Sequence, residues 1–227
     1  MRVLIAEWFA TFVLIFGGTG AVVVNGITGG DVTLVGVALT WALLVAVMAY
    51  SVGPVSGAHM NPAVTIGLAY GGKHPWRLVP QYVLAQCAGA LTASLLLLAL
   101  TLRAEPRDAV EALGMTKVYK DWVWECFVLE VWLTGVLMFV VMSLSTAKGE
   151  IQALGGFIAG GVIALDILFA GPITGASMNP ARSLGPAIVS GKLDYLWLYL
   201  LAPTVGAVLA VMIWRIIHKP ESVEVKS

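Results

Sequence analysis

The chain of 227 residues carries 13 basic and 13 acidic side chains, 11% of the total, against 59% hydrophobic residues. Soluble globular proteins carry roughly 25% charged residues, so this composition excludes most soluble enzymes and disordered scaffolds and indicates a membrane protein. The net charge is zero, which excludes nucleic-acid binding that depends on many basic groups contacting phosphates.

Six stretches are long and apolar enough to cross a bilayer, since a spanning helix needs about 20 mostly apolar residues. They run over residues 4–24, 33–52, 79–102, 122–144, 152–171 and 195–217. Glu7 interrupts the first stretch early and no small-residue cleavage site stands out, so we expect a retained span rather than a secretory signal. Two further apolar pieces, 61–70 and 179–190, are too short to cross a hydrocarbon layer of about 30 Å.

Each short piece begins at the end of a repeated motif. Residues 53–63 (GPVSGAHMNPA) recur as residues 171–181 (GPITGASMNPA), and eight of the eleven pairs are identical. The repeat predicts two halves with three spans each, an odd number, so the second half enters from the opposite face and the short pieces enter from opposite sides. The predicted parts are a first repeat at 1–102, a connecting loop at 103–121, a second repeat at 122–217 and a short tail at 218–227.

The sequence Asn-Pro-Ala opens both short pieces, as Asn61-Pro62-Ala63 and as Asn179-Pro180-Ala181. Asn is a good N-cap because its side-chain oxygen accepts from free backbone N–H groups, and Pro suits the first helical position. Two such helices meeting head to head would bring two side-chain NH2 groups and two positive dipole ends together near the middle of the membrane. This arrangement would orient a polar solute and repel cations.

Arg182 is a single base inside the second short piece, three residues after Asn179. A charge within the membrane is costly and indicates a functional site. Its guanidinium would offer hydrogen-bond donors to solutes while its positive charge opposes hydronium and metal ions. We therefore expect Arg182 to line a pore.

These elements resemble the major intrinsic proteins, the family of aquaporins and glycerol facilitators. The resemblance rests on Ser56–Val64, on Gly175–Ser183 and on the Ala6-Glu7 pair in the first span. It implies an all-α membrane protein in which six transmembrane helices and two re-entrant half-helices surround a pore. It also implies that four subunits assemble side by side as a homotetramer.

By the same resemblance, the narrowest part of the pore is formed by Trp41, Ile167, Ala176 and Arg182. This combination is similar to that of plant nodulin-26-like channels, although Ser183 stands where glycerol facilitators usually have Asp. The resemblance further implies that Glu7 and Glu130 accept hydrogen bonds from the re-entrant loops. The loop residues expected to line the pore are Gly57, Ala58, His59, Gly175 and Ser177. The facing and protonation of Asp166, where the related plant channels often have Asn, stay open.

The sequence therefore predicts a passive channel for water and small uncharged solutes such as glycerol, which excludes protons and ions and is not an enzyme. Its partners would be these solutes and the lipid bilayer. Neither Cys87 nor Cys126 belongs to a Cys/His cluster, so we expect no metal and no cofactor. A weak excess of seven Lys and Arg residues over five favours cytoplasmic termini, in a multi-pass protein of the plasma or inner membrane.

Two alternatives belong to other classes. An ion-coupled secondary transporter would also use inverted repeats and broken helices, with Asp166 as its unassigned ionisable candidate. An intramembrane enzyme is disfavoured because the three histidines are scattered at 59, 74 and 218 and no catalytic set has helical spacing. The sequence leaves open whether the solute is water, glycerol, a metalloid hydroxide or an undissociated small acid.

Overall fold

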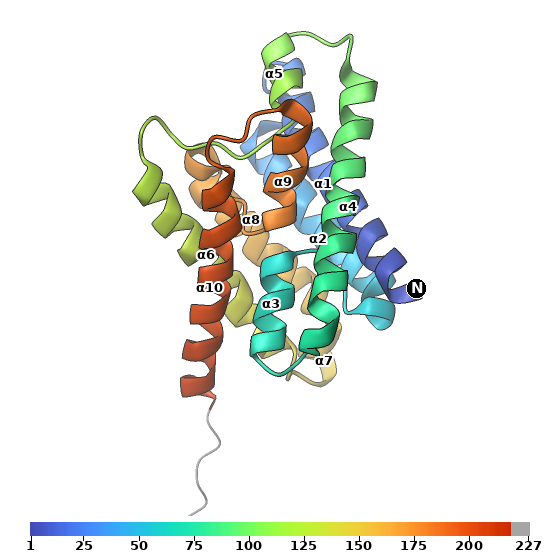
Figure 1. Ribbon diagram of the computed structural model, residues 1–227, viewed down its shortest axis with the longest axis vertical. Helices are drawn as coiled ribbons and strands as arrows, with labels where there is room; N and C mark the ends of the chain where they lie inside the picture. The colour runs from blue at the N-terminus through green and yellow to red at the C-terminus, as the bar shows by residue number, and fades with distance from the viewer. Residues whose placement is uncertain (219–227) are drawn as a thin grey trace, which may run out of the picture.

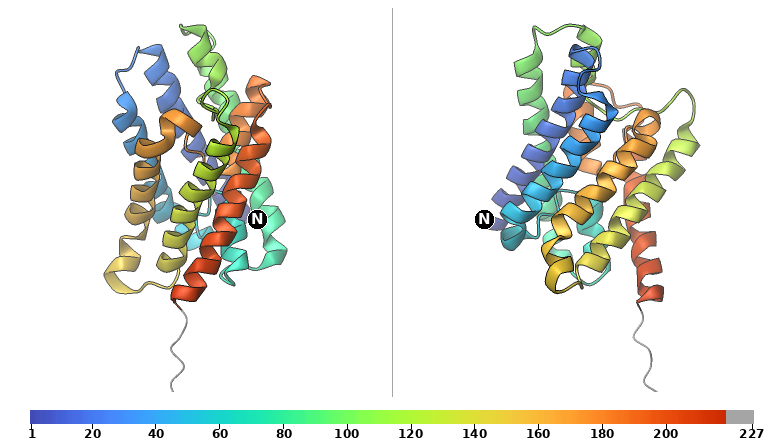
Figure 2. Two further views of the ribbon diagram at one scale, coloured as in Figure 1. Left: turned by 90° about the vertical axis from the view of Figure 1, so that its left-hand side faces the viewer. Right: turned by 180° about the vertical axis from the view of Figure 1, so that it is seen from behind.

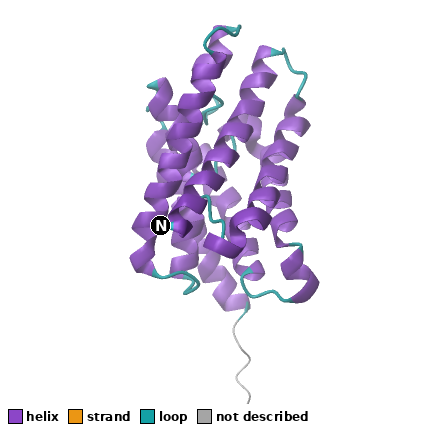
Figure 3. Cartoon of the chain, turned by 90° about the vertical axis from the view of Figure 1, so that its right-hand side faces the viewer, coloured by secondary structure: helices purple, strands orange, loops and turns teal. Residues whose placement is uncertain are grey.

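The structure is a computed structural model that describes residues 1–218, and within this range it contains helices and loops but no strand (Figure 3). The α-helices are α1 (Arg2–Ile27), α2 (Thr33–Ser56), α3 (Pro62–Tyr70), α4 (Val79–Thr101), α5 (Arg107–Ala112), α6 (Val123–Leu144), α7 (Gly149–Ala153), α8 (Gly155–Thr174), α9 (Pro180–Ser190) and α10 (Leu196–Ile217), and a 3-10 turn, η1 (Trp76–Leu78), precedes α4. Most of the predicted tail, with the Lys219 and Lys226 counted for orientation, lies outside the described residues.

Six of these helices are long and apolar enough to span a membrane: α1, α2, α4 with η1, α6, α8 and α10. They run side by side as a bundle of tilted helices (Figure 2). The predicted fold class is thereby confirmed, and the protein is a multi-pass integral membrane protein. The segment 103–121, predicted as a connecting loop, is not a loop throughout, because residues 107–112 form the short helix α5.

The helices α3 and α9 are the two re-entrant half-helices, of 9 and 11 residues. They enter the bundle from opposite ends, with α9 in the upper part and α3 in the lower part of Figure 1, and their first residues face each other between the spans. Asn61 and Asn179 are the N-caps, and Pro62 and Pro180 occupy the first helical positions. The sequence thus folds locally as its capping pattern predicts.

Glycines let the spanning helices approach closely at equivalent points of the two halves. A Cβ atom on Gly89 of α4 would meet the carbonyl oxygen of Trp8 in α1, and a Cβ atom on Gly206 of α10 would meet that of Val131 in α6. Without side chains at these crossings, helix backbones pack directly on one another, as is common in membrane proteins. Of these close pairs α1–α4 and α6–α10, helices α4 and α10 each contact both half-helices.

Candidate functional site

Matching backbone turns precede the two half-helices. Gly57 directly follows α2 and Gly175 directly follows α8, and both glycines have left-handed backbone angles. Four further residues of the turns have positive φ although they are not glycine: Ala58 (49°), Met60 (52°), Ala176 (42°) and Met178 (54°). Such angles are uncommon for residues with a side chain and persist only where surrounding contacts hold them. The contacts that hold these turns are therefore part of the site.

Two buried glutamates supply those contacts. Glu7 of α1 accepts hydrogen bonds from the backbone N–H groups of His59 and Met60, both at 2.9 Å. In the same way Glu130 of α6 accepts from Ser177 at 2.8 Å and from Met178 at 2.9 Å. Neither glutamate is exposed to solvent. The two carboxyl groups lie where the sequence analysis expected loop support, and each fixes one strained turn.

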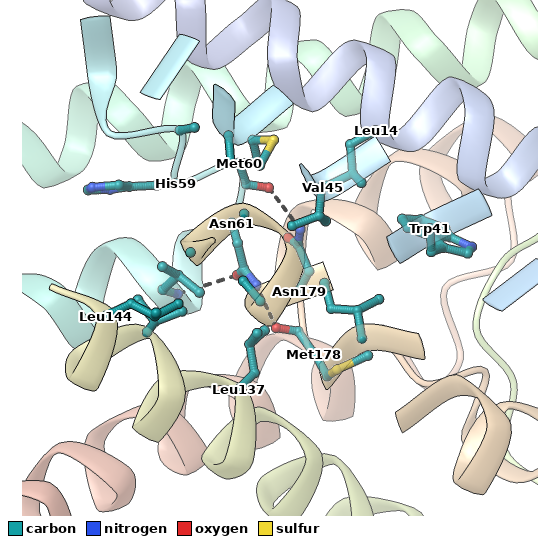
Figure 4. Close-up of a pocket in the computed structure, with 18 of the residues that line it drawn as sticks. Leu14, Trp41, Val45, His59, Met60, Asn61, Leu137, Leu144, Met178 and Asn179 are labelled. Carbon is teal, nitrogen blue, oxygen red and sulfur yellow. Dashed lines mark hydrogen bonds between the residues drawn. The ribbon is translucent and has the colours of Figure 1, made fainter. Parts of the chain in front are cut away.

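The two Asn side chains divide their hydrogen bonds between capping and the opposite loop. The side-chain oxygen of Asn61 accepts from the N–H of Ala63 at 2.9 Å, and that of Asn179 accepts from Ala181 at 3.0 Å. The NH2 group of Asn61 donates to the carbonyl of Met178, and that of Asn179 donates to the carbonyl of Met60, both at 2.8 Å (Figure 4). Each NH2 group has two hydrogens, so one donor per Asn is left beyond this pair of bonds.

A cavity of about 190 Å³, here called the Asn-Pro-Ala cavity, lies against both Asn side chains. Its wall is mostly apolar, with Leu14, Val45 and Leu137 among the residues around the Asn pair in Figure 4. Of the residues that the sequence analysis expected to line the pore through the loops, Gly57, Ala58, His59 and Ser177 line this cavity. The cavity thus combines a few polar groups from the loops and the Asn pair with a mostly apolar wall.

A second cavity of about 210 Å³, here called the Arg182 cavity, is lined by Arg182, Gly175 and residues of the loop after α5. Trp41 and Ile167 line both cavities, and Ala176 lines the Asn-Pro-Ala cavity. The four residues expected at the constriction are therefore brought together where the two cavities adjoin. The junction thus has an apolar side, formed by Trp41 and Ile167, and a charged side, formed by Arg182.

Arg182 is buried, with 4% of its surface exposed, and is held by contacts that its sequence position alone does not predict. Its Nη1 atom donates to the carbonyl of Gly114 at 2.8 Å. Its guanidinium carbon lies 5.0 Å from the ring centre of Trp41, within the range of a cation–π contact. Sequence reasoning missed Gly114, because nothing in a loop sequence indicates which carbonyl will turn inward. The remaining guanidinium N–H groups are donors without a hydrogen bond to the described protein.

Asp166 of α8 is buried, with 2% of its surface exposed, and it lines neither cavity. Its Oδ2 atom has no hydrogen-bond partner within residues 1–218. The structure therefore places this carboxyl in the packed bundle, outside the lining of both cavities.

Within residues 1–218, no three His, Cys, Asp or Glu side chains are close enough together to hold an ion. The site offers amide, guanidinium and carbonyl groups, which bind solutes by hydrogen bonds.

The profile of one protein family, described as "Major intrinsic protein", matches residues 1–214, nearly the whole chain. The chain belongs to the major intrinsic protein family. The resemblance expected from the doubled Asn-Pro-Ala motif is confirmed, and its half-helices and caps are those described above.

Plant members of the family are among the similar sequences. Aquaporin NIP1-1 of Zea mays is 45% identical over 215 residues, covering 95% of this chain and 74% of the maize protein. Aquaporin NIP1-3 of Oryza sativa subsp. japonica is also 45% identical, over 94% of this chain and 73% of its own length. The expected similarity to nodulin-26-like channels is thus confirmed at the level of the whole sequence.

A solved structure supports the same conclusion in three dimensions. The X-ray structure of the aquaglyceroporin from Plasmodium falciparum superimposes with a TM-score of 0.85. The two proteins are 30% identical, and the match covers 96% of each chain. This member of the major intrinsic proteins therefore shares both the sequence pattern and the helix arrangement of the family.

Proposed function

We propose that this protein is a passive channel that conducts water and small uncharged solutes such as glycerol and excludes protons and ions. One observation carries the proposal: Trp41, Ile167, Ala176 and Arg182 lie where two cavities adjoin, next to the paired Asn61 and Asn179. Membership of the major intrinsic proteins and the likeness to a protein described as an aquaglyceroporin support it.

Trp41, Ile167, Ala176 and Arg182 form the selectivity filter in this proposal. Trp41 and Ile167 supply an apolar wall, and Arg182 supplies free N–H donors. A polyol can place its carbon skeleton against the apolar wall while its hydroxyl groups accept from Arg182. The bonds are few and exchangeable, so a solute that replaces its hydration here can also leave.

Ion exclusion follows from the charges that face the passage. A cation at the junction meets Arg182 and the positive N-terminal ends of α3 and α9. The NH2 groups of Asn61 and Asn179 offer donors only, so a water molecule beside them is oriented as an acceptor. Such an orientation interrupts the water chain along which a proton would otherwise pass.

Several finer features belong to the same proposal. The chain acts without covalent chemistry, so it is not an enzyme. The halves 1–102 and 122–217 are inverted repeats, and the termini lie on the cytoplasmic side of a plasma or inner membrane. Four copies assemble as a homotetramer, which the resemblance to the family implies.

The alternative of an ion-coupled transporter needs an ionisable group in the path of the solute. Asp166 was the candidate for that role, and it lines neither cavity. This position favours the channel over the transporter.

The test is stopped-flow light scattering on proteoliposomes. It measures the permeability to water, glycerol, urea and undissociated lactic acid under outward and inward gradients. We expect water and glycerol to equilibrate faster than in protein-free vesicles. Permeabilities equal to those of protein-free vesicles for all four solutes would contradict the proposal.

A further inference from the structure

Gly18 of α1 lies directly against the indole of Trp41. A Cβ atom placed on Gly18 would stand 2.5 Å from Cδ2 of Trp41 and closer still to Cε2 and Cζ2. Real Cβ atoms do not approach other atoms so closely, so any side chain at position 18 requires the indole to move. Trp41 itself is buried, with 5% of its surface exposed.

The three nearest indole atoms show whether Gly18 covers a face of the ring or its edge. Cε2 is a fusion carbon with three ring neighbours, so an atom that approaches it and both Cδ2 and Cζ2 lies over a face of the indole, not at its edge. Gly18 lines neither the Asn-Pro-Ala cavity nor the Arg182 cavity, whereas Trp41 lines both. The indole therefore stands between the α1 backbone and the passage.

A side chain at position 18 would push the ring toward the passage. The indole would need to move by roughly 1 Å or more to regain ordinary carbon–carbon contact at about 3.5–4.0 Å. The guanidinium of Arg182 also packs on the indole, 5.0 Å from the ring centre. The displacement would reduce the space at the junction of the two cavities, past Trp41 and Arg182, where a solute moves in the proposed function.

We propose that Gly18 is a positioning residue that sets the width of the filter, and hence the largest solute that passes, by letting Trp41 recede against α1. This inference rests on the proposed channel function. It assigns size selection to a position that does not itself face the solute.

The test compares glycerol and water permeability of proteoliposomes containing Gly18→Ala with those of the wild type. Gly20→Ala is the matched control, because it makes the same change in the same helix where a Cβ atom meets only Leu97 Cδ1 at 3.8 Å. We expect Gly18→Ala to lower the ratio of glycerol to water permeability by about tenfold or more, and Gly20→Ala to leave it unchanged.

A double variant separates positioning from general damage to the fold. In Gly18→Ala/Trp41→Val the ring that the new methyl group displaces is absent, so the ratio should equal that of Trp41→Val alone. A methyl group that acted only on helix packing would have the same effect with and without the indole. An unchanged ratio in Gly18→Ala, or the same decrease in both backgrounds, would overturn the inference.

The experiment also distinguishes a failure of this inference from a failure of the proposed solute range. If the wild type conducted water but no glycerol, the range proposed above would be wrong. The inference would then be read from water permeability, which Gly18→Ala should lower and Gly18→Ala/Trp41→Val should restore. No decrease in water permeability in that case would overturn the inference as well.

Discussion

The side-chain NH2 group of Asn61 donates a hydrogen bond of 2.8 Å to the main-chain carbonyl of Met178, 117 residues further along the chain. Asn179 makes the same bond to Met60 in the other direction. Both carbonyls belong to turns with positive φ, and both turns are held by buried glutamates. The cap of each half-helix therefore also ties the two halves of the protein together.

Replacing Asn61 with Ala should destabilise the protein by roughly 2–4 kcal/mol. Losing an N-cap costs about 1 kcal/mol, and leaving the buried Met178 carbonyl without its donor costs about 1–3 kcal/mol more. Asn25→Ala is the control, because Asn25 also accepts a backbone hydrogen bond but lies at the end of α1, away from the half-helices. Thermal unfolding in detergent measures the difference, and equal losses in the two variants would contradict the role of the cross-link.

Trp41→Ala should widen the filter and raise the ratio of glycerol to water permeability by about tenfold, because the indole forms the apolar wall opposite Arg182. Trp132→Ala is a suitable control, since this Trp is 54% exposed on the outside of α6. Stopped-flow light scattering measures both permeabilities. If the ratio in Trp41→Ala stayed at the wild-type value, Trp41 would not line the filter.

Arg182→Val removes a buried positive charge from the junction of the cavities, so it should increase proton conductance. Lys117→Gln removes a charge from an exposed residue that lines the same cavity, and we expect a much smaller effect. The decay of an imposed pH gradient in proteoliposomes compares the variants. A decay rate in Arg182→Val no faster than in the wild type would argue against its part in ion exclusion.

Stability should fall as the pH drops below about 6.5, in part through His74 in the loop between α3 and η1. Burial lowers the pKa of His74, and the nearby Glu7 carboxyl opposes this effect. Because the unfolded chain then binds a proton more readily than the folded protein, folding loses free energy with falling pH. His74→Gln should flatten part of this dependence in thermal unfolding between pH 5 and pH 8. An identical pH dependence in the wild type and in His74→Gln would exclude His74 as a source of the lost stability.

His74 packs on other aromatic rings, so the pH experiment needs a control variant that keeps these ring contacts. Its ring centre lies 4.5 Å from Tyr82 and 4.9 Å from His59, and its Nε2 atom has no partner within residues 1–218. His74→Phe keeps the ring contacts without a titrating group. A flattened pH dependence in both His74→Gln and His74→Phe would assign the effect to charge, whereas a change in His74→Gln alone would assign it to lost packing.

Much of the fold was predictable because it depends on local sequence patterns. The apolar stretches predicted the six spans, and Asn-Pro at two equivalent positions predicted the starts of α3 and α9. The inverted arrangement followed from counting three spans between copies of the motif. These features depend on helix length and capping, which neighbouring residues determine.

The remaining parts of the site depend on contacts between distant segments. The carbonyl of Gly114 that receives Arg182 and the contact between Gly18 and Trp41 follow no sequence spacing. Trp41 and Ile167 were assigned to the filter by resemblance, since a Trp in an apolar helix is equally suited to packing. Their position at the junction of two cavities comes from the structure.

The most direct test of passive conduction is glycerol uptake into proteoliposomes with and without an imposed proton gradient. Internal glycerol should rise only to the external concentration, at the same initial rate in both conditions, because a passive channel moves the solute only down its own gradient. Accumulation above the external concentration when the gradient is present would contradict the channel and show coupled transport.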